Sequence, residues 1–366
     1  MSIKTGIVGL PNVGKSTLFN ALTELKIEAE NYPFCTIEPN HGMVKVNDLR
    51  LQEINQIIPT QKISPSFLEF VDIAGLVKGA SEGEGLGNQF LSNIRNVDAI
   101  IHVVRCFDDD NITHVENSIS PIRDIEIINT ELLLKDIESL SKRLSKIDKT
   151  VKSGNNEYKA EHDLLTLLLE NVNQGILIKN IELTDDQKKI LKSLSPLTSK
   201  PTLYVANIKE DNLDQDSKNL YLQELEEWAD KNNESILSLC TKFEMEIVDL
   251  NEEEKKEFLN SYGFSLTGLD RLTSATFKLL GLETFFTAGE KEIKSWTIKR
   301  DSFAVDAAGE IHSDIQRGFI KAEVYSLSNL LKYQSEENLK NSGKIRQEGK
   351  NYIVKDGDII FFKFNV

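Results

Sequence analysis

The chain has few cysteines, no long apolar run and a deficit of basic residues. Its three cysteines, Cys35, Cys106 and Cys240, lie far apart and form no Cys-x-x-Cys pair. This spacing argues against a disulfide framework and a zinc site, and it favours a reducing cytoplasm. No run of about 18 apolar residues could form a membrane-spanning helix, and residues 1–9 lack the features of a secretory signal. The sequence therefore predicts a cytoplasmic protein without a membrane anchor.

Acidic residues outnumber basic ones, which gives a net charge of -15. The excess lies in residues 1–124 and 201–280, which carry -6 and -9, whereas residues 125–200 and 281–366 are each balanced. An acidic chain is not typical of nucleic-acid-binding proteins, but a balanced segment can still carry a local basic face. With 366 residues, of which 40% are hydrophobic, the chain is long enough for two or three globular domains.

Short apolar runs separated by helical stretches indicate a parallel sheet covered on both faces. The first run, residues 7–8, leads into a glycine-rich loop and then into a helix. Later runs occupy residues 67–71, 99–104, 202–206 and 236–239. We therefore expect an α/β fold with a doubly wound, mostly parallel sheet.

A heptad pattern between the later runs predicts an inserted helical hairpin. Its apolar positions alternate in steps of four and three: Leu133, Ile137, Leu140, Leu144, Ile147 and Val151. After a turn at residues 152–156, a second helix is indicated by Leu165, Leu168, Val172 and Ile176. The narrow seam and its charged flanks favour a projecting antiparallel coiled coil over two core helices of one larger domain.

The sequence changes again from about residue 282, where short aromatic and β-branched runs alternate with turns. The runs are residues 296–298, 318–320, 352–354 and 359–362, and Asp356-Gly357 predicts a tight turn between the last two. About 85 residues suffice for an independent core. We expect a small α+β domain in residues 281–366.

Residues 9–16, Gly-Leu-Pro-Asn-Val-Gly-Lys-Ser, match the G-x-x-x-x-G-K-S pattern of a phosphate-binding loop. The loop follows a strand and opens a helix, whose N-terminus adds about half a positive charge at the phosphates. Lys15 would neutralise the β- and γ-phosphates, and Ser16 would hold Mg²⁺. The nucleotide-binding residues expected here are Asn12, Val13, Gly14, Lys15, Ser16 and Thr17. The alternative is a plain glycine turn with a solvated lysine.

A second motif supports this interpretation. Asp72 ends an apolar run, Gly75 follows three residues later, and Thr36 precedes both in a loop. Asp72 would hold Mg²⁺ through a water, the Gly75 N–H would reach the γ-phosphate, and Thr36 would complete the metal shell with Ser16. This order and spacing is typical of P-loop NTPases in which the γ-phosphate orders two switch loops.

The base-recognition segment departs from the guanine-specific pattern N-K-x-D. It has Asn207, Ile208, Lys209 and Glu210, so that the lysine is replaced by isoleucine and the aspartate by a longer glutamate. Adenine presents an acceptor at N1 where guanine presents a donor, so a carboxylate there would not help it. Asn207 could serve N6 and N7 of adenine beside an apolar wall at Ile208. The alternative is a loose guanine site that still prefers GTP.

Several segments together resemble the Obg-like ATPase (YchF) family of translation-factor-class P-loop NTPases. They are residues 9–17, NYPFCTIEPN at 31–40, DIAGLVKGAS at 72–81, GEGLGN at 83–88, the run 207–210 and TFFTAG at 284–289. The resemblance covers essentially the whole chain and includes the glutamate at position 210. It implies a nucleotide-binding domain of residues 1–124 and 201–280, a helical coiled coil at 125–200, and a ubiquitin-like (TGS) domain at 281–366. It further implies Mg²⁺-dependent ATP hydrolysis and binding to the ribosome, chiefly the large subunit.

The residues that assist hydrolysis are less evident, because Leu76 stands where many switch NTPases have a water-orienting glutamine. Asn12 could help to hold K⁺ against the phosphates, by analogy with related NTPases. The resemblance makes His114 a candidate for positioning water, although its spacing alone favours a solvated loop histidine. His102 lies within an expected strand and is more consistent with a core or edge residue. Cys35 adjoins Thr36, so its oxidation could disturb the metal shell, but an incidental buried residue is the simpler interpretation.

Three functions remain open at this point. The first is an ATPase that acts as a nucleotide-dependent switch on the ribosome, as a monomer that contacts ribosomal RNA or protein. The second is an Obg-type GTPase that differs in base choice. The third is a ribosome- or RNA-binding module in which nucleotide has a structural role. No acceptor site or arginine-rich lid of a metabolic kinase is evident in the sequence.

Overall fold

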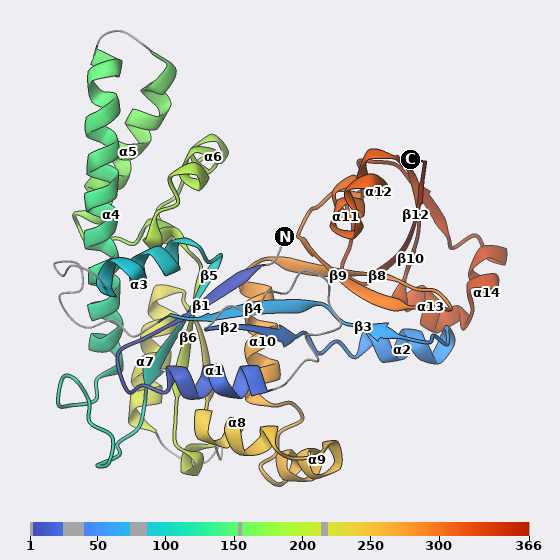
Figure 1. The fold of residues 1–366 in the computed structure, drawn as a ribbon, viewed down its shortest axis with the longest axis horizontal. Coiled ribbons are helices and arrows are strands. Elements are labelled where there is room, and N and C mark those ends of the chain that lie inside the picture. Colours follow the sequence, from blue (N-terminus) through green and yellow to red (C-terminus); the bar gives the residue numbers. More distant parts are fainter. Residues whose placement is uncertain (1–2, 25–39, 74–85, 153–155, 214–218, 366) are drawn as a thin grey trace. The chain divides into compact units, whose positions relative to one another are not determined.

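The protein is described here by a computed structural model that covers residues 3–24, 40–73, 86–152, 156–213 and 219–365 (Figure 1). The predicted switch residues Cys35, Thr36, Gly75 and Leu76 lie outside the described residues. The chain divides into two compact units. The P-loop unit comprises Ile3–Gly42 and Glu69–Leu269, and the C-terminal unit comprises Met1–Ser2, Met43–Leu68 and Asp270–Val366.

The first sheet has the strand order β2-β4-β1-β5-β6-β7. Its strands are β1 Lys4–Val8, β2 His41–Lys45, β4 Phe67–Asp72, β5 Ala99–Arg105, β6 Thr202–Asn207 and β7 Ser235–Leu239. The pairs β1–β4, β1–β5, β5–β6 and β6–β7 are all parallel. All seven residues of β5 are buried, as expected for a strand covered on both faces. The predicted α/β fold with a mostly parallel sheet is confirmed, and β2 is a strand that the sequence analysis missed.

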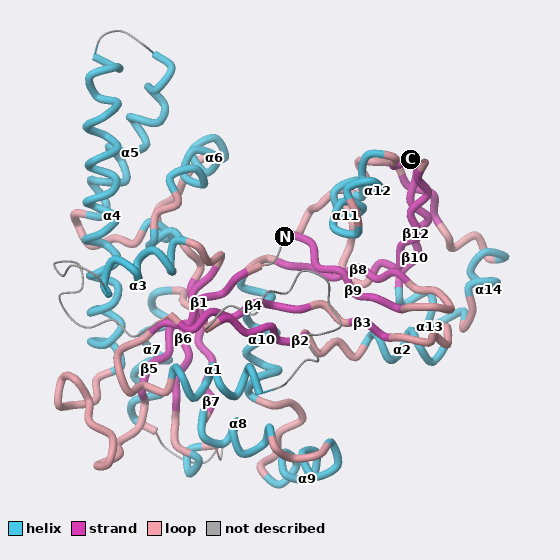
Figure 2. Tube along the Cα trace, in the orientation of Figure 1, coloured by secondary structure: helices cyan, strands magenta, loops and turns pink. Residues whose placement is uncertain are grey.

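The helices of the P-loop unit connect these strands in the order expected of a doubly wound sheet (Figure 2). They are α1 Lys15–Glu24, α3 Leu86–Arg95, α4 Pro121–Lys152, α5 Lys159–Val172, α6 Asp185–Leu194, α7 Leu220–Asn232, α8 Thr241–Val248 and α9 Glu252–Ser261. Short 3₁₀ turns, η2 Asn156–Tyr158, η3 Ile178–Asn180, η4 Leu197–Ser199 and η5 Glu210–Asn212, lie between them.

Helices α4 and α5 lie side by side and extend away from the sheet (Figure 1). Leu133, Leu140 and Ile147 of α4 are buried in one cluster with the apolar residues of α5, which confirms the predicted seam. Ile176 was wrongly assigned to the second helix: α5 ends at Val172, and Ile176 is exposed. Gly175 follows the helix with φ +82°, and this turn separates Ile176 from the packed face.

The base of this hairpin is fixed by a buried carboxylate on α4. Asp136 is completely buried and accepts hydrogen bonds from the Leu197 and Thr198 amides and from the Thr198 hydroxyl, at 2.6–2.8 Å. Burial raises the pKa of Asp136, whereas these donors lower it. Because the donors belong to η4, directly before β6, the carboxylate ties α4 to the segment that returns to the sheet.

The C-terminal unit contains a mixed sheet with the order β11-β10-β12-β8-β9-β3. Its strands are β3 Ile63–Ser64, β8 Leu282–Thr287, β9 Ile293–Lys299, β10 Phe319–Ser326, β11 Arg346–Glu348 and β12 Asp358–Phe364. Its helices are α2 Arg50–Ile57, the C-terminal part of α10 Gly268–Leu279, α11 Ala304–Ile311, α12 Ser313–Arg317, α13 Leu327–Tyr333 and α14 Glu336–Asn341.

The strand expected at residues 352–354 does not form. Ile353 makes only an isolated bridge with Phe303, and β12 pairs with β10 and β8 instead. Gly357 has φ +84°, so the Asp356-Gly357 turn forms but does not join a hairpin. An apolar run of three residues carries too little periodicity to distinguish a strand from an extended loop.

The segment Met43–Leu68, which the sequence analysis placed in the nucleotide-binding domain, belongs to the C-terminal unit. Strand β3 pairs with β9, and Leu51 and Ile54 of α2 are buried in a cluster with residues of β8 and α13. The predicted domain limits at residues 124, 200 and 280 remain predictions. Among the described residues, none of the helices combines the length and apolar composition that crossing a membrane requires.

Candidate functional site

The phosphate-binding loop lies between β1 and α1, as the motif predicts. Gly9 and Gly14 have φ angles of +155° and +102°, which residues other than glycine rarely adopt. A Cβ on Gly14 would lie 2.3 Å from Asn207 Nδ2 and 3.1 Å from Thr241 Oγ1. Glycine is therefore required at position 14 both for the turn and for the close approach of the base-recognition segment.

Lys15 is buried, with 7% of its surface exposed, and its Nζ donates to the Leu10 carbonyl at 2.7 Å. Burial lowers the pKa of Lys15 to about 8, and the nearby Asp72 carboxylate partly offsets this shift. A desolvated ammonium group interacts strongly with an added anion. Lys15 is thus suited to phosphate, and the alternative of a solvated lysine is wrong.

Ser16 and Asp72 are brought together across 56 residues. Ser16 Oγ donates to Asp72 Oδ2 at 3.4 Å, and Asp72 Oδ1 is buried with no hydrogen-bond partner among the residues that the structure describes. Burial raises the pKa of Asp72, while Lys15 and Ser16 lower it. A hydroxyl and an unsatisfied carboxylate oxygen are ligands that a hard divalent cation prefers, so these residues fit Mg²⁺. The other expected ligand, Thr36, and the expected γ-phosphate donor, Gly75, lie outside the described residues.

A cavity of about 560 Å³ adjoins the loop on the side of β6 and η5. Its walls contain all four residues of the predicted base-recognition run. The lining residues are Asn12, Gly14, Thr17, Phe107, Asp109, Ile112, Asn207, Ile208, Lys209, Glu210, Asp211, Cys240, Thr241 and Lys242. The volume lies within the range of small-molecule and cofactor sites.

Asn207 holds two walls of this cavity together. Its Nδ2 donates to the Val13 carbonyl at 2.9 Å, and its Oδ1 accepts from the Thr241 amide at 3.1 Å. Asn207 is 3% exposed, so its amide acts first as a scaffold between the phosphate loop and α8. Its expected direct contact with adenine remains a prediction.

Ile208 and Glu210 differ in how they are held. Ile208 is 4% exposed and packs into the core beneath the cavity, where it presents an apolar surface. Glu210 begins η5, and its Oε1 accepts a hydrogen bond from the Tyr262 hydroxyl at 2.8 Å. Sequence reasoning missed Tyr262, because it lies 52 residues from Glu210 and belongs to no motif.

The loop between β5 and α4, drawn as loop in Figure 2, contributes Phe107, Asp109 and Ile112 to another wall of the cavity. Arg105 holds this loop in place. Arg105 is 1% exposed, and its guanidinium donates to the carbonyls of Phe107, Asp109 and Ile112 at 2.9–3.2 Å. Asn12 Nδ2 donates to the carbonyl of Thr113 at 3.1 Å. This loop is therefore connected directly to the phosphate loop.

His114 follows this contact and is buried, so the interpretation as a solvated loop histidine is wrong. Its Nε2 lies 2.8 Å from Asp124 Oδ2, and its Nδ1 accepts from the Glu116 amide at 3.1 Å. Asp124 lies in the first turn of α4, so the pair joins the loop to the long helix. With both ring nitrogens bonded to protein, this arrangement favours anchoring, and water positioning by His114 remains a prediction.

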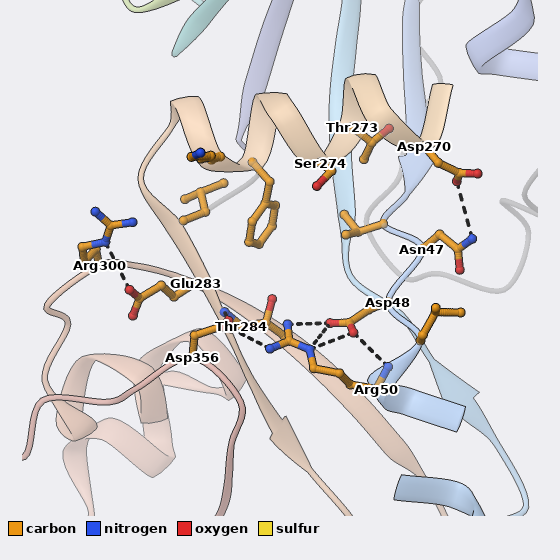
Figure 3. Close-up of a pocket in the computed structure, with 15 residues that line it drawn as sticks. Asn47, Asp48, Arg50, Asp270, Thr273, Ser274, Glu283, Thr284, Arg300 and Asp356 are labelled. Carbon is orange, nitrogen blue, oxygen red and sulfur yellow. Dashed lines mark hydrogen bonds and ion pairs between the residues drawn. The ribbon is translucent and has the colours of Figure 1, made fainter. Parts of the chain in front are cut away.

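The C-terminal unit has its own cavity, of about 520 Å³ (Figure 3). Arg50 lies between Asp48 and Asp356 and donates to both, and Asp356 also accepts from the Thr284 amide. Arg300 pairs with Glu283 at the far side. These charges are satisfied by one another, so the cavity presents few free groups to a ligand and is the weaker candidate.

Two protein-family models match the chain. One is described as "50S ribosome-binding GTPase" and matches residues 4–137. The other, YchF-GTPase_C, is described as "Protein of unknown function (DUF933)" and matches residues 282–365.

Curated relatives and a solved structure match the full length. The "Ribosome-binding ATPase YchF" of Bacillus subtilis (strain 168) is 50% identical over 366 residues and that of Escherichia coli O157:H7 is 48% identical, each over 100% of both chains. The structure described as "Structure of the Schizosaccharomyces pombe YchF GTPase" has a TM-score of 0.89 and 37% identity, over 99% of this chain and 98% of that chain. The curated relatives are named as ATPases and the solved structure as a GTPase. The choice between ATP and GTP is therefore argued from the residues of the base pocket.

Proposed function

The chain belongs to the YchF family, and from this premise we propose that it is a Mg²⁺-dependent ATPase that prefers ATP to GTP and acts as a nucleotide-dependent switch on the ribosome. The observation that carries the proposal is the base pocket beside the phosphate loop. There, Ile208 and Glu210 replace the lysine and aspartate that read guanine, and Ile208 supplies a buried apolar wall. The curated relatives named ATPase support the same choice.

Each residue near the phosphates has an electrostatic role in this proposal. Lys15, already desolvated, binds phosphate oxygens, and the loop amides from Asn12 to Thr17 orient the triphosphate. Ser16, Asp72 and Thr36 would hold Mg²⁺, which would supply positive charge against the phosphates. Asn12 donates its Nδ2 to the Thr113 carbonyl, so its Oδ1 is the atom that would take part in a K⁺ site. Gly75 would donate its N–H to the γ-phosphate.

The ribosome is proposed as partner from the names of the curated relatives and of the family model. We expect contact chiefly with the large subunit, through ribosomal RNA or protein, by a cytoplasmic monomer. The segments proposed for docking are the helical hairpin within residues 125–200 and a TGS-type fold at 281–366. Nucleotide binding is assigned to residues 1–124 and 201–280.

Calorimetric titration with ATP and GTP tests the base preference. The wild type should bind ATP at least about tenfold more tightly, and the combined variant Ile208→Lys, Glu210→Asp should shift the preference toward GTP by a similar factor. Tighter binding of GTP by the wild type would favour the Obg-type GTPase instead, in line with the GTPase name of the Schizosaccharomyces pombe relative.

Co-sedimentation with ribosomes tests the switch. The proposal expects ribosome affinity to differ between the complex with a non-hydrolysable ATP analogue and the complex with ADP. Equal ribosome affinity of the two nucleotide complexes would instead indicate a ribosome-binding module in which the nucleotide has a structural role. A Lys15→Ala variant, which should not bind the triphosphate, shows the affinity of the nucleotide-free state.

A further inference from the structure

A hydroxyl outside the base pocket holds the carboxylate that lines it. Glu210 forms part of the cavity wall, whereas Tyr262 does not. Tyr262 Oη donates to Glu210 Oε1 at 2.8 Å. One of the two carboxylate oxygens is therefore engaged before any base binds.

The Tyr262 hydroxyl is held in place by packing. The Tyr262 ring packs edge-on against Phe243, with 4.8 Å between the ring centroids. Phe258 is stacked on Phe243 at 5.2 Å, and its ring centroid lies 5.5 Å from that of Tyr262. Phe243 is 1% exposed and lies on α8, whose first residues line the cavity. Aromatic groups packed in this way orient their polar tips precisely enough to fix a partner.

The elements that carry Tyr262 are fixed as well. Tyr262 is the C-cap of α9, and the N-terminus of α9 is closed by a capping box between Asn251 and Glu254. The hydrogen bond to Glu210, with a smaller contribution from burial, raises the pKa of Tyr262. The phenol therefore remains protonated, and remains a donor, at neutral pH.

Guanine and adenine place different demands on this carboxylate. A guanine-specific pocket uses both carboxylate oxygens, one for N1–H and one for the exocyclic amine. The Tyr262 hydroxyl takes one lone-pair site of Oε1 and fixes the orientation of the carboxylate. A guanine that needs both oxygens must therefore compete with this bond for Oε1 or turn the carboxylate away from the tyrosine. Adenine carries an acceptor at N1 and does not need the second oxygen. The contact therefore penalises GTP more than ATP.

We propose that Tyr262 is a specificity-determining residue, which positions Glu210 so that its carboxylate cannot grip the guanine edge with both oxygens. The inference deepens the proposed function and rests on it. Tyr262 acts through Glu210 and need not touch the base.

The test compares ATP and GTP affinities of four proteins: wild type, Tyr262→Phe, Glu210→Ala and the double variant. Tyr262→Phe keeps the packed ring and removes only the hydroxyl. It should tighten GTP binding about tenfold, the value of one hydrogen bond to a charged group, and change ATP binding less than about threefold. In the Glu210→Ala background, Tyr262→Phe should change the ratio of the two affinities by less than about twofold.

A matched control is available in the same unit. The Tyr221 hydroxyl also donates to a carboxylate, that of Asp108, at 3.0 Å, and neither residue lines the cavity. Tyr221→Phe should leave the ratio of ATP to GTP affinity unchanged. Inosine triphosphate gives a second reading, since it has N1–H but lacks the exocyclic amine. The Tyr262→Phe change should increase the affinity for inosine triphosphate by a smaller factor than the affinity for GTP.

Three results would overturn the inference. The first is an unchanged ratio of ATP to GTP affinity in Tyr262→Phe, and the second is an equal change of this ratio in the Glu210→Ala background. The third is an equal increase in affinity for inosine triphosphate and for GTP. Thermal melting of each variant establishes that it is folded. A wild type that binds GTP as tightly as ATP would instead defeat the proposed function. A wild type that prefers ATP, with a silent Tyr262→Phe, would defeat this inference alone.

Discussion

Single residues in the phosphate site are charged groups held partly out of water. Lys15 and Asp72 each have a pKa displaced toward the neutral form, chiefly because burial removes solvent from the charge. Asp72 Oδ1 also has no hydrogen-bond partner within the described part of the chain, so the folded protein bears an electrostatic cost at the site. The proposed Mg²⁺ and triphosphate would supply the missing charges, so their binding would relieve this cost.

Replacement of Asp72 by asparagine should separate metal binding from folding. We expect the Mg²⁺ concentration for half-maximal ATP hydrolysis to rise at least about tenfold. The melting temperature should not fall, because the substitution removes a desolvated charge. A magnesium titration of the hydrolysis rate measures the first effect, and Asp163→Asn, at an exposed position of α5, is the control. An unchanged magnesium requirement would remove Asp72 from the metal site.

His102 provides a pH test of the buried sheet. It lies in β5 at 2% exposure, which confirms it as a core residue, and burial with the charges of Lys179 and Lys15 lowers its pKa to about 3. The unfolded chain takes up a proton below about pH 6.5, whereas the folded chain does not until about pH 3. Stability contributed by neutral His102 is therefore present above pH 6.5 and lost as the pH falls toward 3.

Urea unfolding at pH 7.5 and 5.0 measures this effect. His102 alone should account for a loss of about 2 kcal/mol in the free energy of unfolding, and His102→Phe should lack that loss. The exposed His312, replaced by phenylalanine, should leave the loss as in the wild type. Equal pH dependence of wild type and His102→Phe would contradict the account.

Individual site residues could be predicted from the sequence where the residues that act together are close neighbours in the chain. Gly9, Gly14, Lys15 and Ser16 act within one loop, so their spacing encodes their geometry. Tyr262 was not predictable, because only the fold brings it to Glu210. The scaffold role of Asn207 was also missed, since its contact with the Val13 carbonyl joins residues 194 positions apart.

At the scale of elements, the loop after β5 connects the phosphate site to the long helix α4. Asn12 bonds to the Thr113 carbonyl, and the next residue, His114, bonds to Asp124 in the first turn of α4. The His114 and Asp124 side chains are 4% and 2% exposed, so their interaction is little screened by solvent. A change at the phosphate loop thus has a short covalent and hydrogen-bonded path to the hairpin.

A double-mutant cycle tests this connection. His114→Ala and Asp124→Ala should each destabilise the protein by about 3 kcal/mol, and the double variant by little more than one of them, because each single change leaves a buried polar partner. Chemical denaturation measures these values. His162→Ala, which breaks the more exposed pair with Asp148, should cost less than about 1 kcal/mol. If the destabilisation of the double variant equalled the sum of the two single values, the His114 and Asp124 side chains would not interact as proposed.

Turnover of His114→Ala and Asp124→Asn distinguishes anchoring from direct catalysis. His114→Ala should lower the ATP turnover number while nucleotide affinity is kept. If His114 acts by anchoring the loop, Asp124→Asn should lower turnover as well, although it leaves the imidazole in place. A loss confined to His114→Ala would show that the imidazole itself positions water.

Elements were predictable where one periodicity persisted over several turns or one strand was buried throughout. The α4 seam has a clear 3.5-residue period, and β5 is apolar except for His102 and Arg105 and is buried throughout. The prediction failed at residues 352–354 and at Ile176, where three or four apolar positions had no fixed partner in the sequence. Strand β3 was missed because its two residues pair with β9, some 230 positions away.

At the scale of the whole molecule, sequence order and compact units do not coincide. Met43–Leu68 belongs to the C-terminal unit although residues on both sides of it belong to the P-loop unit. Within the C-terminal unit, Arg50 joins this segment to the Asp356 turn (Figure 3). Burial lowers the pKa of Arg50, but the hydrogen bonds and charges of Asp48 and Asp356 outweigh it and raise the pKa overall.

Arg50→Ala should therefore loosen the segment locally. Loss of these charged hydrogen bonds should lower the opening free energy of the α2 amides by about 2 kcal/mol, as measured by hydrogen exchange. Arg300→Ala, which removes the exposed pair with Glu283 in the same cavity, should have little effect on α2. Protection of α2 that does not change in Arg50→Ala would show that apolar packing alone holds the segment.

Adenine selection is the claim on which the rest depends, and one crystal structure tests it most directly. The protein should be crystallised from equal concentrations of non-hydrolysable ATP and GTP analogues with Mg²⁺. We expect adenine against Ile208, with Glu210 still bonded to Tyr262. Guanine in the cavity, with both Glu210 oxygens on its N1–H and exocyclic amine, would contradict the account.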